Sequence, residues 1–240
     1  MKTITFIAIT LLAGAIAGTM LVIINQGIVQ PFIEQAIALE NQRAAAEGEM
    51  INPIEFDNYR IWQRIGQIAA GTILGTSIGA LFGLVFAYSR SSIPASSNVK
   101  KALILAGVMW LVLFIVPALK YPANPPAVGN PDTIYYRQSL YVPYLAISGL
   151  TALGAAFLYH KFGSKQVKKA LIPAIYSGII IAAYLTMPPN SDAITAPTDL
   201  VVGFRIASGF TMSVFWLLLG VILGWFWDKF KPHEIVKVSI

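Results

Sequence analysis

Residues Ile65–Ser89 read IGQIAAGTILGTSIGALFGLVFAYS, a stretch without a single charged side chain. A helix needs about 20 mostly apolar residues to cross the hydrocarbon core of a bilayer. In lipid, a helix satisfies the backbone hydrogen-bonding groups within its own segment. The stretch therefore predicts a transmembrane helix, which we place at residues 65–88.

Five further apolar runs flank this helix, and we expect transmembrane helices at about residues 4–29, 102–119, 140–160, 170–187 and 205–227. Only 12% of all residues are charged, whereas soluble domains carry about 25%. A cleaved signal peptide is the weaker interpretation of the first run, because the apolar core of a signal spans only about 7–15 residues. The sequence predicts an all-α integral membrane protein with six transmembrane helices in one polytopic domain, residues 1–240.

The distribution of charge along the chain predicts its orientation. If the N-terminus is cytoplasmic, the inner side holds eleven of the 17 Lys and Arg residues, and the outer side holds nine of the 11 acidic residues. Lysine and arginine are enriched in cytoplasmic loops. We expect a multi-pass protein of the cell membrane with both termini in the cytoplasm. The net charge of +6 then reports topology, and no nucleic-acid partner is needed.

Several classes of function are disfavoured. The chain has no cysteine and only two histidines, and it contains no Walker loop, H-E-x-x-H, G-x-S-x-G or dinucleotide fingerprint. We therefore expect no enzyme activity, no catalytic residues and no tightly bound cofactor. No carboxylate, lysine or histidine lies at the middle of a predicted helix, which argues against a proton- or sodium-coupled pump.

Glycines at every fourth position predict close helix packing. The second predicted helix has four on one face, and the first has two at the same spacing, so the two helices should approach closely in the small-xxx-small manner. These residues are Gly14, Gly18, Gly71, Gly75, Gly79 and Gly83.

Two outer segments connect the predicted helices. We expect an acidic outer loop at residues 30–63 and a proline-rich outer loop at residues 120–137. Ile33, Ala36, Ile37 and Leu39 suggest that the first of these begins as a helical continuation along the outer interface. Carboxylates favour hard divalent cations, so the metal-ligand candidates are Glu34, Glu40 and Asp132. The alternative for the acidic loop is a solvated face that needs its charge for solubility.

The three helices that return inward begin alike, each with a proline, an acid soon after it, and an arginine about two turns later. Our hypothesis is that three helical hairpins surround a pseudo-threefold centre, where Arg60, Arg137 and Arg205 form ion pairs or a gate at the outer mouth. Their partners would be acids such as Asp57, Asp132 or Asp199. The alternative is that all three arginines extend to lipid phosphates.

The segment LKYPANPPAVGNPDTIYYRQSLY, Leu119–Tyr141, resembles the signature of the CbtA family of proposed cobalt transporter subunits. The match is carried by Lys120, Tyr121, Pro122, Asn124, Pro125, Pro126, Ala127, Val128, Gly129, Pro131, Thr133 and Arg137.

This resemblance implies a membrane permease or permease subunit that takes up a divalent transition-metal cation, with cobalt as its substrate. It also implies a link to cobalamin biosynthesis and a small histidine-rich membrane partner subunit. Two other functions stay open from the residues: a membrane scaffold that transports nothing, and a carrier of small solutes or anions that uses the outer arginines.

Overall fold

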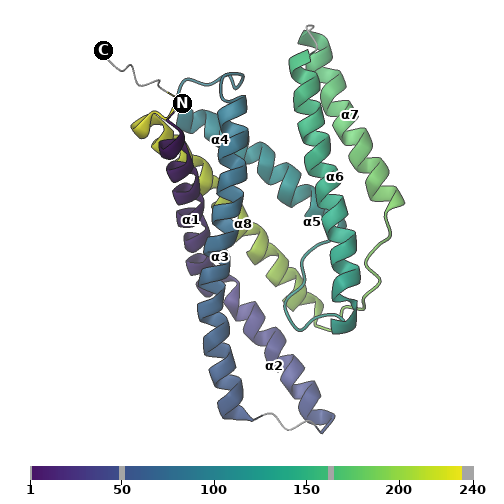
Figure 1. Cartoon of the computed structure of the whole chain (residues 1–240). Coiled ribbons are helices and arrows are strands. Elements are labelled where there is room, and N and C mark those ends of the chain that lie inside the picture. The colour runs from purple at the N-terminus through teal and green to yellow at the C-terminus, as the bar shows by residue number, and fades with distance from the viewer. Residues whose placement is uncertain (1, 49–51, 162–164, 234–240) are drawn as a thin grey trace. The chain divides into compact units, whose positions relative to one another are not determined.

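A computed structural model describes residues 2–48, 52–161 and 165–233, and those residues contain helices and no strand. The helices follow one another along the chain (Figure 1). They are α1 (Thr3–Ile28), α2 (Gln30–Ala46), α3 (Pro53–Ser89), α4 (Asn98–Trp110), the π-helical η1 (Leu111–Ile115), α5 (Val116–Lys120), the short 3-10 η2 (Pro131–Thr133), α6 (Ile134–Lys161), α7 (Lys165–Thr186) and α8 (Thr198–Phe230).

Five of the described helices are long and apolar enough to cross a membrane. They are Thr3–Ile28, Pro53–Ser89, Asn98–Lys120, Pro131–Tyr159 and Thr198–Phe230. The remaining predicted helix, at residues 170–187, is represented by a shorter apolar segment, Ala170–Thr186. The prediction of an all-helical membrane protein is confirmed, whereas a sixth span and the threefold repeat stay predictions.

The residue contacts divide the chain into two compact units, which are described separately. The first unit comprises Met1–Val108, Pro125–Ala127 and Pro197–Ile240, and so contains α1, α2, α3, most of α4, and α8. The second comprises Met109–Asn124 and Val128–Ala196, with η1, α5, η2, α6 and α7.

In the first unit, α1 and α3 meet along their glycines. A Cβ atom added to Gly14 would lie 2.9 Å from the Cα of Gly79, and one added to Gly18 would lie 2.8 Å from the Cα of Gly75. These distances are too short for any side chain, so the backbones themselves form the contact. The glycines identified in the sequence thus lie on the face that joins the two helices.

The start of α1 and the end of α8 lie together in the first unit. The backbone N–H of Lys2 donates to the carbonyl of Pro232 at 2.8 Å. The rings of Phe6 and Trp227 pack edge to face with centroids 5.9 Å apart, and the Arg90 guanidinium lies 5.6 Å from the Trp227 ring centroid. Lys2 and Pro232 therefore lie at the same end of this unit.

The acidic segment at residues 30–63 is helical over most of its described length, and the helical continuation expected at its start is present. Residues 30–46 form α2, and α3 begins at Pro53, twelve residues before the predicted transmembrane start. Asn52 caps α3 by accepting a hydrogen bond from the backbone N–H of Ile54 at 3.1 Å, and Pro53 suits the first helical position. Residues 49–51, which include Glu49, lie outside the described residues.

In the second unit, a π-helical turn precedes Pro117. The N–H of Val116 donates to Leu111, five residues back, and Pro117 has no N–H to offer. The carbonyl of Val112 therefore has no donor within its own helix. The buried Ser148 hydroxyl of α6 donates to it at 2.6 Å. Since its one proton is used there, Ser148 accepts from the Tyr176 hydroxyl of α7, 2.9 Å away.

Removal of the Ser148 hydroxyl should therefore destabilise the protein. A backbone N–H at position 117 should reduce this loss of stability, because it could donate to the carbonyl of Val112 instead. We expect Ser148→Ala to lower the free energy of unfolding by about 1–3 kcal/mol, because it leaves a buried carbonyl without a donor. In a Pro117→Ala background the same change should cost at least about 1 kcal/mol less. Thermal unfolding of the four purified proteins in detergent measures this coupling. An equal cost in both backgrounds would contradict the proposed compensation.

Candidate functional site

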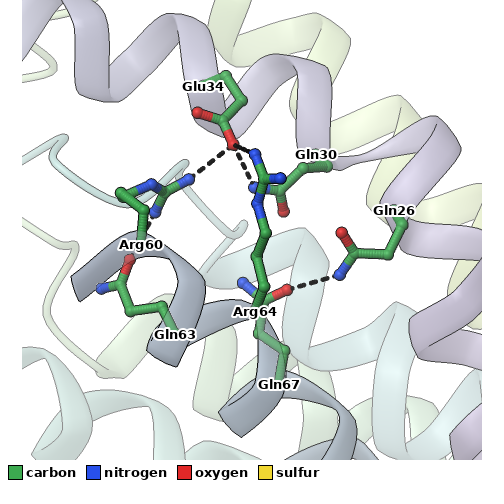
Figure 2. Close-up of polar contacts among 7 residues, drawn as sticks. All are labelled: Gln26, Gln30, Glu34, Arg60, Gln63, Arg64 and Gln67. Carbon is green, nitrogen blue, oxygen red and sulfur yellow. Dashed lines mark hydrogen bonds and ion pairs between the residues drawn. The ribbon is translucent and has the colours of Figure 1, made fainter. Parts of the chain in front are cut away.

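The principal polar site of the first unit joins α2 to α3 through one carboxylate oxygen. Oε1 of Glu34 accepts from Nη2 of Arg60 at 2.7 Å and from Nη2 of Arg64 at 2.9 Å. It also accepts from Nε2 of Gln30 at 2.7 Å, so three donors converge on a single atom (Figure 2). We call Gln30, Glu34, Arg60 and Arg64 the outer clamp, after the side of the membrane on which the sequence predicts them.

Helical spacing produces this arrangement. Arg60 and Arg64 are four residues apart on α3, and Gln30 and Glu34 are four apart on α2, so each pair occupies one face of its helix. The Arg60 side chain is only 11% exposed, and its Nη1 also donates to Oε1 of Gln63. Two guanidinium groups and one carboxylate leave the clamp with a net charge of about +1.

The surroundings of Glu34 hold it in its ionised form. Partial burial alone raises the pKa of this carboxyl group, but the hydrogen bonds from Gln30, Arg64 and Arg60 outweigh burial and lower the pKa to about 2. The carboxylate is therefore charged at any physiological pH. It balances one of the two neighbouring guanidinium charges.

Uncharged polar pairs continue from the clamp along α1 and α3. Nε2 of Gln26 donates to Oε1 of Gln67 at 3.0 Å, a pair that lies next to the clamp in Figure 2. Further along the same two helices, the hydroxyls of Thr19 and Thr72 lie 2.8 Å apart. The glycine contact follows these pairs. Along α3, the contacts therefore change from the charged clamp with α2 to neutral polar pairs with α1, and then to bare backbone against α1.

In the second unit, the start of the signature loop is fastened to α7. Nζ of Lys120 donates to the carbonyl of Tyr184 at 2.7 Å and lies 4.6 Å from the centroid of that ring. The hydroxyl of Tyr121 donates to the carbonyl of Pro188 at 2.7 Å. A cation at a helix C-terminus is favourable, because the last carbonyls there lack partners. Lys120 and Tyr121 thus join the end of α5 to the end of α7.

The other end of the signature loop is held by Asp192. Its Oδ2 accepts from the Thr133 hydroxyl at 2.5 Å, and Nε of Arg137 lies 3.2 Å from the same oxygen without the alignment of a hydrogen bond. Gly129 has φ +103°, and a Cβ there would lie 3.3 Å from Oδ2 of Asp192. The loop therefore needs glycine at this position both for its backbone conformation and for the space beside the ion pair.

The remaining signature residues are distributed over the loop surface and interior. Pro125 is buried, whereas Pro122, Pro126 and Pro131 are exposed and Asn124 is half-buried. Pro125–Ala127 belong to the first unit, while the rest of the loop belongs to the second.

The structure does not bring the three predicted metal ligands together in a cluster of carboxylate or imidazole groups. No group of three or more His, Cys, Asp or Glu residues that could hold a metal ion occurs among the described residues. Glu34 is engaged by two arginines, and Glu40 lies six residues further along α2, about 9 Å away and on another face. Asp132 is exposed, and its backbone N–H is capped by Asn130 at 2.9 Å.

The outer arginines use acids other than those that the sequence suggested. Arg60 pairs with Glu34 rather than with Asp57, Asp132 or Asp199, and Arg137 pairs with Asp192. Arg205 lies near the start of α8. No common centre for the three arginines follows from the structure, because Arg137 belongs to a different unit.

Sequence reasoning missed Arg64, Gln30 and Asp192, although a signal for Asp192 was present. Asn190 precedes it by two residues, just as Asn130 precedes Asp132. In both places the asparagine side chain accepts from the backbone N–H two residues on, at 3.1 Å for Asn190 and 2.9 Å for Asn130. This repeated asparagine turn marks the outer connections.

A family model described as "Probable cobalt transporter subunit (CbtA)" matches residues 3–228 of the chain. The protein belongs to the CbtA family. The match extends from the start of α1 to the end of α8 and so includes both the outer clamp and the signature loop. No curated protein and no solved structure matches the chain. Membership of the CbtA family agrees with the resemblance seen in the signature segment, and together with the apolar helices it supports a multi-pass membrane protein of a family described as probable cobalt transporter subunits.

Proposed function

We propose that this chain is the permease subunit through which divalent cobalt enters the cell. The observation that carries the proposal is the CbtA-family match over residues 3–228, together with five apolar helices long enough to span a bilayer. Cobalt is here the transported substrate, and the chain itself is neither an enzyme nor the holder of a tightly bound cofactor. Uptake would supply cobalt for cobalamin biosynthesis.

The proposed topology has both termini in the cytoplasm of the cell that carries the protein in its membrane. The hydrogen bond between Lys2 and Pro232 supports a common side for the two ends. The excess of lysine and arginine on that side supports the cytoplasm. Because both histidines then lie on the inner side, imidazole ligands for the ion at the outer side would come from the small histidine-rich partner subunit.

Within this function, Glu34 lowers the positive charge of the outer clamp and so weakens its repulsion of an arriving cation. Without its charge, Arg60 and Arg64 would face an arriving dication with a net charge of +2 instead of +1. For a dication about 5 Å away in water, one unit charge changes the interaction energy by about 1.7 kcal/mol. This energy corresponds to roughly a tenfold change in local cation concentration. The same carboxylate can exchange its guanidinium partners for the ion, in competition with them.

The test is uptake of radioactive cobalt at low concentration in a host that lacks its own cobalt uptake. We expect Glu34→Gln to reduce the initial rate about tenfold and Glu40→Gln to reduce it less than about twofold. Both changes remove one negative charge from α2, but Glu40 is exposed and about 9 Å further along the helix, where solvent and salt screen it.

Three other results would redirect the proposal. Full uptake by the Glu34→Gln, Glu40→Gln double variant would reject the role of the acidic residues while leaving the permease role intact. No uptake by the unmodified chain, when it is folded and bound to its partner, would favour the scaffold. Uptake of an anion that depends on Arg60 and Arg64 would favour the anion carrier, which the net positive charge of the clamp also suits.

A further inference from the structure

The outer part of α3 carries a row of isoleucines that its own unit leaves uncovered. Ile54, Ile61, Ile65 and Ile68 are 73%, 59%, 64% and 48% exposed. At 100° per residue their side chains fall within about 60° of one another around the helix. We call these four residues the isoleucine stripe.

Neither neighbouring helix reaches this face. The Gln26–Gln67 hydrogen bond aligns the end of α1 with the middle of α3, and α1 ends two residues later at Ile28. Beyond that point α3 continues past α1, as Figure 1 shows. The outer clamp holds α2 through Arg60 and Arg64, which point about a quarter-turn away from the isoleucine stripe.

Lipid cannot account for the whole stripe. The hydrocarbon core can begin no further out than Ile65, because Arg64 is the last charged residue before the uncharged run. Ile54 lies eleven residues before that point, about 16 Å along the helix. The headgroup layer adds only about 5–7 Å on each side of the core. An exposed row of β-branched side chains that extends from lipid into water is typical of a protein contact surface.

The charges beside the stripe indicate what kind of partner it fits. Glu55 and Asp57 flank its outer end, and both are exposed acids. A second copy in the same membrane orientation would bring like acids together at that end, which is unfavourable. A helix with an apolar face and with lysine or arginine near its outer end would complement both the isoleucines and the acids.

We infer that the isoleucine stripe is the docking site for a membrane-spanning helix of the transporter's other subunit, basic at its outer end. The inference rests on the proposed function only in that the chain acts with a second subunit. The partner's helix would contact α3 from the outer leaflet of the membrane to the water outside, beside the outer clamp. Binding there would place the partner within reach of the residues that an arriving cation meets first.

The test uses the full-length chain in living cells, with the photoreactive residue benzoylphenylalanine at position 54, 61 or 65. Position 59 serves as the control, because Tyr59 is also exposed on α3 but lies roughly opposite the stripe. We expect a crosslinked product with one other membrane polypeptide from the three stripe positions, and at least fivefold less from position 59. The same polypeptide should co-purify with the chain and be lost in Ile54→Lys and Ile61→Lys but not in Tyr59→Lys.

Each other outcome overturns the inference. A product of twice the chain's mass would assign the stripe to a second copy, and a crosslink within the chain would assign it to the second unit. Equal products from all four positions, or none, would leave no specific partner for the stripe. Cobalt uptake measured in the same cells separates the two proposals, because uptake without the crosslink contradicts only the docking site.

Discussion

Gly75→Ala should prevent α1 and α3 from packing, and we expect it to cost at least about 3 kcal/mol of the free energy of unfolding. The new methyl group would lie 2.5 Å from the Cα of Gly18 and 2.8 Å from its backbone nitrogen. Neither atom can rotate away, so the helices must separate along their whole contact. Overpacking of this kind typically costs about 1–3 kcal/mol even where side chains can adjust. Thermal unfolding in detergent, with the yield of monodisperse protein, measures the loss.

Gly66→Ala is the matched control, because it makes the same chemical change in the same helix. A Cβ at Gly66 would have no neighbour within 4 Å. Alanine is a better helix former than glycine by about 1 kcal/mol, so this variant should be slightly more stable than the parent. If both variants unfolded like the parent, the glycine contact would not hold the first unit together.

Asp192→Asn should destabilise the second unit by about 3 kcal/mol. The Asp192 side chain is 5% exposed, and it supplies the negative charge beside Arg137. Asparagine retains the size of the side chain but leaves the half-buried guanidinium without a counter-charge, and breaking a buried pair in this way typically costs about 3–5 kcal/mol. The lower end of that range applies because Arg137 is 27% exposed. Thermal unfolding of the full chain measures the effect.

Asp132→Asn is the control for this prediction, since it is the acid that the sequence singled out in the same region. Asp132 is exposed, so its charge is solvated and its loss should change the free energy of unfolding by less than about 0.5 kcal/mol. A larger loss from Asp132→Asn than from Asp192→Asn would reverse the assignment of the ion pair.

A structural feature could be predicted from the sequence when the residues that cause it lie close together in the chain. The transmembrane helices depend on runs of apolar residues, and the α1–α3 contact depends on glycines at a fixed spacing, so both could be read from the chain. The cap of α3 at Asn52-Pro53 is equally local, yet within the acidic residues 30–63 the sequence suggested only a helical continuation at the start of the segment. Charged residues do not by themselves end a helix. The residues that would interrupt α2 are absent from its interior, since it contains no glycine and its single proline lies in the first turn, where proline is tolerated.

The ion pairs were harder to predict because each joins segments far apart in sequence. Glu34 and Arg60 are 26 residues apart, and Asp192, the partner of Arg137, lies 59 residues after Thr133, which donates to the same carboxylate. The position of Arg60 and Arg137 after a helix start made them candidates for ion pairs, and each of them does form one. The sequence could not identify their acids, because several carboxylates lie in each outer segment and only the packing of the helices selects among them.

The π-helical turn shows a third kind of limit. A proline inside a helix usually kinks or ends it, but this helix continues past Pro117 to Lys120 by widening one turn before the proline. This solution depends on Ser148, 36 residues away, which supplies the donor that the proline lacks. Such compensation by a distant side chain cannot be seen in the local sequence.

The central proposal, that this CbtA-family chain passes cobalt into the cell, is tested most directly by radioactive cobalt uptake. The measurement uses a host without its own cobalt uptake that makes the full-length chain together with its partner subunit. We predict uptake at least about tenfold above the empty host and about tenfold lower in Glu34→Gln. Uptake no higher than in the empty host, with the chain folded in the membrane and bound to its partner, would contradict the permease role.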